Sequence, residues 1–128
     1  MYFELITIPC LSDNYAFILY NARNRSALLV DAPEAAPINE TLTKNNLNLE
    51  KIFLTHHHAD HINGLDGILD KHNALTVGAQ ADIHRLPKLD EYVQAGDEFF
   101  FQGQTGKIFD VSGHTIGHIA LYFPAQNI

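Results

Sequence analysis

The feature that most constrains the fold is a short apolar run that leads directly into a cluster of histidines. Residues 51–54 read Lys-Ile-Phe-Leu, and residues 55–61 read Thr-His-His-His-Ala-Asp-His. A short, continuously apolar run is typical of a strand that is covered on both faces. A helix-like segment, residues 64–71, opens with glycine soon afterwards. The sequence therefore predicts a buried strand, a polar loop at its carboxyl end, and then a helix.

This loop carries the donors of a metal site. Four imidazoles and one carboxylate lie within residues 56–61, and no cysteine is near them in the sequence. Nitrogen and oxygen donors of this kind suit zinc, iron or manganese. If the chain stays extended, His56, His58 and Asp60 share one face and His57 takes the other. A histidine-rich surface loop or a purification tag is the alternative, but the run is internal, so a metal site is the better interpretation.

A second histidine loop lies between two predicted strands. Residues 112–118 read Ser-Gly-His-Thr-Ile-Gly-His. The glycines at 113 and 117 permit backbone angles that are closed to other residues, which indicates a tight loop rather than a helix. His114 in such a loop can lean into a site that is built elsewhere in the fold.

The two loops together supply donors for two metals. His56, His58 and His114 would give three nitrogen ligands with a fourth position for water, which is the arrangement of a catalytic zinc. Asp60 and His61 remain for a second metal.

The rest of the chain predicts one α/β domain over residues 1–128. Strands are expected at residues 3–8, 15–20, 26–30, 51–55, 75–77, 98–102, 107–111 and 119–123, and helices at 35–45, 64–71 and 79–85. Pro9 is expected to end the first strand, because proline cannot donate to a ladder. A hairpin is expected around residues 103–106. Strands and helices alternate over residues 26–77, which implies a mixed sheet packed by helices.

Composition excludes some partners. Eight Lys and Arg against 15 Asp and Glu give a net charge of -7, which argues against a nucleic-acid backbone or an anionic membrane as the partner. The single cysteine, Cys10, is compatible with a reducing compartment. The chain has neither a long apolar stretch nor a basic signal-like start, so we expect a cytoplasmic protein.

Three motifs carry a family resemblance. They are Ser12-Asp13-Asn14-Tyr15, residues 55–61 with Gly64 following, and Gly113-His114-Thr115-x-Gly117-His118. With them the chain resembles the amino-terminal part of a glyoxalase II, the hydroxyacylglutathione hydrolase branch of the metallo-β-lactamase superfamily.

This resemblance implies the fold and the ligands. It implies an α/β fold, the metallo-β-lactamase-like αββα sandwich. Residues 1–128 would cover roughly the amino-terminal half to two thirds of it, as a mixed sheet with helices on one face and the start of a second sheet. The resemblance assigns His56, His58 and His114 to the first metal, and Asp60 and His61 to the second. Zinc is the expected metal, with iron or manganese as alternatives, and the complete enzyme would have two sites.

The resemblance also implies an activity. We expect hydrolysis of a glutathione thioester such as S-lactoylglutathione, by hydroxide on the metals, as in methylglyoxal detoxification. Asp60 would orient that hydroxide. The remaining ligands of the second metal would follow Ile128, so we expect at most one firmly bound metal per chain. Alternatives are a persulfide dioxygenase, a lactonase, a β-lactamase-like enzyme, or a metal-binding fragment without activity.

Two further residues are expected to support the ligands without binding metal themselves. Asp31 follows an apolar strand, where it is either a turn former or a brace for a ligand histidine. The sequence Asp31-Ala32-Pro33 replaces the family's more usual Asp-Pro-Gly or Asp-x-Gly but keeps the acid. His118 opens a strand, where histidine more often bonds a backbone carbonyl, so we assign it a supporting role.

Overall fold

The computed structural model describes most of the chain. The described residues are 3–11, 14–55, 62–84, 86, 88–110, 119–124 and 128. Their elements, in chain order, are β1 (Phe3–Cys10), β2 (Asn14–Asn21), β3 (Ser26–Val30), α1 (Ala35–Lys44), β4 (Asn48–Phe53), α3 (Leu65–Leu69), β5 (Leu75–Ala79), the 3-10 helix η1 (Gln80–Asp82), β6 (Glu91–Val93), β7 (Glu98–Phe101), β8 (Gln104–Asp110) and β9 (Ile119–Tyr122).

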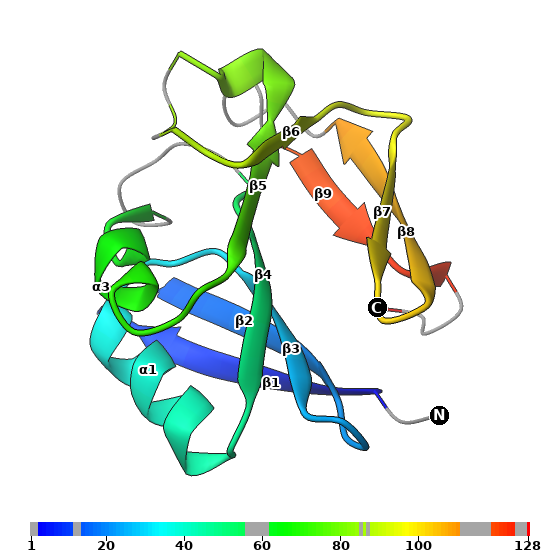
Figure 1. Ribbon diagram of the computed structural model, residues 1–128. Helices are drawn as coiled ribbons and strands as arrows, with labels where there is room; N and C mark the ends of the chain where they lie inside the picture. The colour runs from blue at the N-terminus through cyan, green and yellow to red at the C-terminus, as the bar shows by residue number, and fades with distance from the viewer. Residues whose placement is uncertain are drawn as a thin grey trace.

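The larger sheet has six strands in the order β1-β2-β3-β4-β5-β6 (Figure 1). The pairs β1–β2 and β2–β3 are antiparallel, whereas β3 to β6 run parallel to one another. Helix α1 connects β3 to β4, and α3 lies between β4 and β5. The predicted mixed sheet packed by helices is therefore confirmed.

The first strand does not end where the sequence predicts. Pro9 lies inside β1 and pairs with Tyr15 of β2. β1 is at the edge of the sheet and has β2 as its one neighbour. Proline is tolerated on an edge strand, where its missing N–H group need not serve a second partner.

The hairpin also turns earlier than predicted. Phe101 pairs with Gln104, so the turn consists of Gln102 and Gly103, with φ of 51° and 77°. Two residues with positive φ fit the tight turns that connect antiparallel strands with the natural twist. Residues 104–106 belong to β8 instead, and Gly106 is buried against Leu121 and Phe123.

The two faces of the six-stranded sheet carry two separate cores. Ile52 of β4 packs in a core with Ile38 and Leu42 of α1. The next residue, Phe53, points to the opposite face and stacks edge-on against Phe99 of β7, with ring centroids 5.3 Å apart. This alternation covers both faces of β4, as its apolar sequence predicts.

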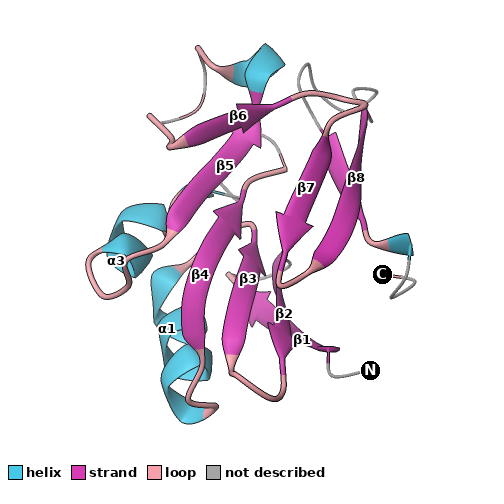
Figure 2. Cartoon of the chain, turned by 45° about the vertical axis from the view of Figure 1, so that its right-hand side comes forward, coloured by secondary structure: helices cyan, strands magenta, loops and turns pink. Residues whose placement is uncertain are grey.

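The resulting layers are helices, a mixed sheet and the start of a second sheet. Figure 2 shows α1 and α3 on one side of the larger sheet and the β7–β8 hairpin on the other. The smaller sheet has the order β7-β8-β9. In the described residues no helix covers its outer face, and Phe100, Phe109 and Tyr122 are exposed there. The layer order matches the expected part of the sandwich.

Candidate metal centre

The predicted ligands lie in two segments outside the described residues. His56, His58, Asp60 and His61 fall within residues 56–61, and His114 and His118 fall within 111–118. Within the described part of the chain, no group of three or more His, Cys, Asp and Glu side chains could hold a metal. The ligand assignments therefore remain predictions, and the described residues show how the two segments are anchored.

Asp31 anchors the start of the first segment. It directly follows β3, and Thr55 lies two residues beyond the parallel neighbour β4. The Thr55 N–H donates to Asp31 Oδ1 at 2.8 Å, and the Thr55 hydroxyl lies 3.0 Å from Oδ1 and 2.8 Å from Oδ2. The Asp31 N–H in turn donates to the Phe53 carbonyl at 2.9 Å. Charge-assisted hydrogen bonds of this kind are stronger than neutral ones, so the chain leaves β4 in a fixed direction.

The backbone of Asp31 shows that it is also a turn residue. Its φ is 66°, in the left-handed region, where Asp and Asn are tolerated better than most residues. The side chain is buried, with 5% of its surface exposed. The structure therefore confirms the turn role and shows the carboxylate accepting hydrogen bonds from Thr55, whereas the histidines that Asp31 was expected to brace lie outside the described residues.

Gly64 anchors the other end of the first segment. Its N–H donates to the Ala32 carbonyl at 2.7 Å. A Cβ at Gly64 would lie 2.6 Å from the Ala35 nitrogen and 2.8 Å from the Glu34 nitrogen. These neighbours are backbone atoms that cannot move aside, so the close approach of this segment to the loop after β3 requires glycine at position 64. The loop after β3 thus holds both ends of the histidine segment.

Ile119 joins the second segment to the same place. It is the first residue of β9 and directly follows residues 111–118. Its N–H donates to the Thr55 carbonyl at 2.9 Å. His58 is three residues from one end of this hydrogen bond, and His114 is five residues from the other. An extended chain spans at most about 3.6 Å per residue. The chain from Thr55 to His58 can therefore cover at most about 11 Å, and the chain from Ile119 to His114 at most about 18 Å.

The first strand ends beside the same loop. The Leu11 N–H donates to Glu34 Oε1 at 2.8 Å, just before the motif that begins at Ser12. Cys10 is buried, and burial together with the nearby Glu34 charge raises the pKa of its thiol. A thiol with a raised pKa is a poor nucleophile and a poor ligand. The nitrogen and oxygen donors of the histidine segments therefore remain the fitting set for a borderline metal.

Sequence reasoning missed the anchoring role of Thr55, which it treated as the end of a strand. Two signals could have revealed it: a hydroxyl residue immediately before the histidines, and an acid directly after the preceding strand. Parallel neighbours end at the same edge of a sheet, where such side chains meet.

An apolar groove begins at this junction. It has a volume of about 390 Å³ and runs between the larger sheet and β9. Thr55 and Ile119 line it near the junction, while Leu5, Phe17 and Leu121 line it farther along β1, β2 and β9.

Comparisons with known proteins agree with this architecture. The family model described as the metallo-beta-lactamase superfamily matches residues 13–128. The hydroxyacylglutathione hydrolases of Ruegeria pomeroyi and Roseobacter denitrificans are each 49% identical to the chain, over 121 and 119 residues. These alignments cover 94% and 93% of the chain but 48% and 47% of the relatives. The chain therefore spans about half the length of the curated relatives it matches.

A solved structure shows the same fold. The B3 metallo-beta-lactamase BLEG-1 superposes with a TM-score of 0.87 at 21% identity, covering 96% of this chain and 68% of that one. This likeness concerns the fold, and the family model adds the sequence evidence over most of the chain. The resemblance to the hydroxyacylglutathione hydrolases is thus confirmed at the level of sequence, and the chain belongs to the metallo-β-lactamase superfamily.

Proposed function

We propose that this chain supplies the first metal site of a hydrolase that cleaves glutathione thioesters such as S-lactoylglutathione. The observation that carries the proposal is the hydrogen bond between Ile119 and Thr55, which joins the ends of the two predicted ligand segments. The 49% identity to hydroxyacylglutathione hydrolases supports the choice of a thioester substrate. A β-lactamase-like activity is supported by the shared fold alone. Since a fold does not determine the chemistry of its site, we do not favour this alternative.

The donors fit a zinc ion, which is our proposed metal. His56, His58 and His114 would hold the first ion, and Asp60 and His61 would contribute to a second. A bound metal would lower the pKa of water and polarise the thioester carbonyl. The chain's own contribution is positional: Asp31, Thr55 and Gly64 hold the ends of the histidine segment, and Asp60 would orient the attacking water.

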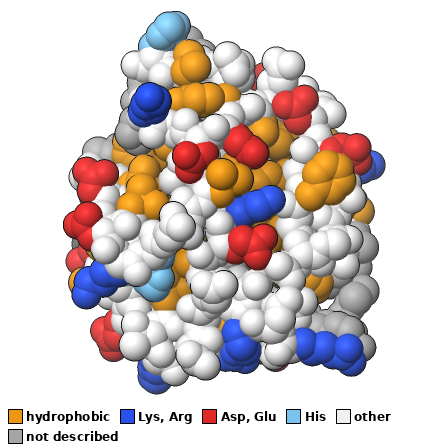
Figure 3. Space-filling model, in the orientation of Figure 1, with side chains coloured by type: hydrophobic (Ala, Val, Ile, Leu, Met, Phe, Trp, Pro, Cys, Tyr) orange, Lys and Arg blue, Asp and Glu red, His pale blue; other side chains and the backbone are white. Residues whose placement is uncertain are grey.

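The charge of the chain supports a small-molecule substrate rather than a nucleic acid, and we propose that the protein acts in the cytoplasm. Figure 3 shows basic side chains scattered over the drawn face, several of them beside acidic ones, without one dominant basic patch among the described residues there. This distribution agrees with the net charge of -7 and disfavours a nucleic-acid partner. Among the described residues no helix is long and apolar enough to cross a membrane.

We further propose that residues 1–128 form one metal-binding domain and that the reaction serves methylglyoxal detoxification.

A chimaera tests the activity. Residues 1–128 replace the matching half of the Ruegeria pomeroyi relative, and hydrolysis of S-lactoylglutathione is measured with added Zn²⁺. We expect activity in the chimaera and its loss in the same chimaera with His56→Ala, since this change removes one of three proposed nitrogen donors. His57→Ala is the matched control, because His57 would take the opposite face to His56 and His58 if the segment is extended. An inactive chimaera beside an active parent would contradict the assignment.

Metal content tests the site independently of turnover. The chain alone should retain at most one Zn²⁺ after gel filtration, because Asp60 and His61 are only two donors and the resemblance provides no others before Ile128. Mass spectrometry of metals on freshly purified protein measures this directly. Two firmly held ions would show that another residue, such as His118, completes the second site.

A further inference from the structure

We propose that Thr55 is a positioning residue that couples the two ligand segments and thereby sets the affinity of the first metal site. The inference rests on the metal site proposed above and goes beyond it. It assigns a role to a residue that is not itself a predicted ligand.

The polar groups of Thr55 connect three parts of the fold. Its N–H and hydroxyl both donate to the carboxylate of Asp31, after β3. Its carbonyl accepts the N–H of Ile119, at the start of β9 in the second sheet. The next residue in the chain is His56, the first proposed ligand. A displacement of Thr55 therefore moves both ligand segments relative to each other.

The surroundings leave Thr55 little freedom. The preceding residue, Leu54, is fully buried, and its N–H donates to the Val77 carbonyl at 2.8 Å. Threonine is β-branched and has few allowed side-chain rotamers, so the hydroxyl bond to Asp31 also fixes χ1. Asp31 is itself held by its bond to Phe53. The junction is held by hydrogen bonds between residues that are not predicted ligands, which lowers the cost of ordering the ligands.

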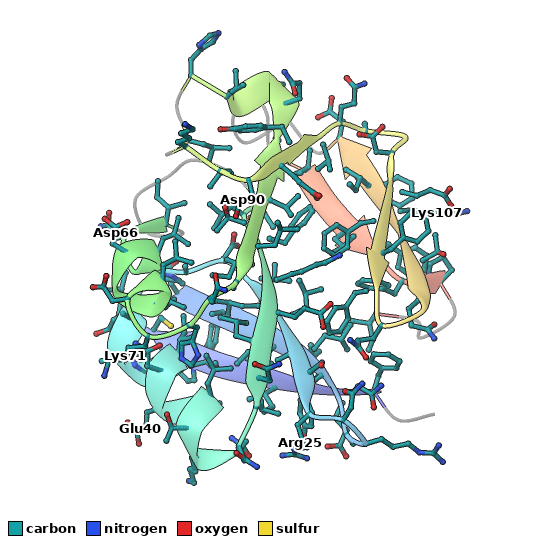
Figure 4. All side chains as sticks on the ribbon, in the orientation of Figure 1. Arg25, Glu40, Asp66, Lys71, Asp90 and Lys107 are labelled. Atoms are coloured by element: carbon teal, nitrogen blue, oxygen red, sulfur yellow. The ribbon has the colours of Figure 1, made fainter. Side chains whose placement is uncertain are left out.

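The chain contains a matched control for this arrangement on the neighbouring strand. Thr76 of β5 donates to Asp90 Oδ2 from its N–H at 2.9 Å and from its hydroxyl at 3.0 Å. Figure 4 shows Asp90 beside β5. Thr76 pairs with Ile52 of β4, and Ile52 is three positions before Thr55 in the sequence. This second threonine–aspartate pair therefore does not flank a predicted ligand. Substitution there removes the same chemistry without touching the junction.

The experiment compares Thr55→Val, Thr55→Ser and Thr76→Val in the full chain. Zn²⁺ affinity is measured by competition with a chromophoric chelator, and stability by urea unfolding in the presence of EDTA. Removing a group that orients metal ligands typically costs 10- to 100-fold in affinity, so T55V should weaken Zn²⁺ binding by at least about tenfold. T55S keeps the hydroxyl and should bind Zn²⁺ as the unchanged chain does. T76V should lose stability and keep its affinity.

The outcomes separate the two proposals. If the unchanged chain binds no Zn²⁺, the proposed metal site is wrong and the inference is overturned with it. If the chain binds Zn²⁺ and T55V binds equally well, or T76V weakens binding as much as T55V, the site stands and the role of Thr55 is overturned. If T55V does not fold, Asp31→Gly replaces it, because glycine tolerates the left-handed backbone and removes the carboxylate that Thr55 contacts. Unchanged Zn²⁺ affinity in D31G then overturns the inference.

Discussion

Single residues at the carboxyl edge of the larger sheet combine backbone and side-chain roles. Asp31 adopts a positive φ, and its buried carboxylate accepts hydrogen bonds from Thr55. Neither role alone selects aspartate, because glycine would satisfy the backbone and glutamate would supply a carboxylate. The combination restricts the position to a short acid or amide, which explains why an acid directly after this strand was informative in the sequence.

The two roles of Asp31 can be separated by substitution. Asp31→Ala and Asp31→Gly both remove the carboxylate, but alanine in the left-handed region costs about 1–2 kcal/mol that glycine avoids. We therefore expect the free energy of unfolding to fall further in D31A than in D31G, by about 1 kcal/mol. Asp31→Asn should be the mildest of the three, because it tolerates the backbone and keeps an acceptor. Urea unfolding with chelator present measures all three, and equal values for D31A and D31G would show that the φ is not a constraint.

His72 should make stability depend on pH. Partial burial, with a smaller contribution from Lys71, lowers the pKa of this histidine from its ordinary value of 6.5. The unfolded chain then binds more protons than the folded chain between the two pKa values, so the free energy of unfolding rises with pH in that window. The stabilisation is complete above pH 6.5 and is lost as the pH falls toward the lower, folded value.

His72→Gln removes this dependence and should flatten the stability profile on the acid side of neutrality. Unfolding in urea at several pH values gives the slope. His84→Gln is the matched control, because His84 is exposed in the folded chain. An equal change of slope in both variants would mean that the burial of His72 does not matter.

At the scale of elements, the local pattern of apolar residues predicted the strands whose bounds depend on their own sequence. β3 begins and ends at the predicted residues Ser26 and Val30, where apolar residues continue without interruption. β6 was not predicted, because three residues carry too little periodicity to reveal a strand. Pro9 was misread because an edge strand is defined by its neighbours in space rather than by its own sequence.

The same distinction applies to the candidate site. The donor types and their spacing were visible in residues 55–61, because ligand chemistry is encoded locally. Asp31 was expected to support this segment, but its contact with Thr55 and the contact of Thr55 with Ile119 were not predicted, since they join residues 24 and 64 positions apart in sequence. Only the pairing of strands brings these residues together.

Two glycines near α3 should respond differently to alanine. A Cβ at Gly64 meets backbone atoms of Glu34 and Ala35, whereas a Cβ at Gly67 meets the Ala35 side chain at 2.7 Å. Helix propensity favours alanine over glycine by up to about 1 kcal/mol, so destabilisation in either variant would report the contact. We expect both G64A and G67A to destabilise by about 1–3 kcal/mol, as overpacking does.

Shortening Ala35 provides the discriminating test. Ala35→Gly removes the atom that meets residue 67 and leaves the backbone that meets residue 64. A double-mutant cycle on urea-unfolding energies should therefore give a favourable coupling for G67A with A35G and none for G64A with A35G. Rescue of G64A by A35G would contradict the backbone contact inferred for Gly64.

At the scale of the whole molecule, the two cores are covered unequally. The helix-side core lies under α1 and α3, whereas the opposite face of the larger sheet meets a second sheet of three strands. The groove between β9 and the first strands is the consequence, and it leaves Leu5 and Phe17 with 47% and 38% of their surfaces exposed. Phe123 and Ile128 exchange backbone hydrogen bonds at 2.8 and 3.4 Å, which brings Ile128 to the rim of this groove.

An apolar groove of about 390 Å³ is large enough to hold a small aromatic dye, and exposed apolar surface of this kind binds such probes. We expect the folded chain to enhance the fluorescence of an anilinonaphthalene sulfonate dye, and Phe17→Ser to reduce that enhancement because it removes a ring from the groove lining. Phe100→Ser is the matched control, since Phe100 is more exposed, at 59%, yet lies on β7 and does not line the groove. Circular dichroism on all three proteins checks that the fold is retained. Equal dye binding by the two variants would show that the dye reports exposed rings in general, and that the groove beside β9 is closed in solution.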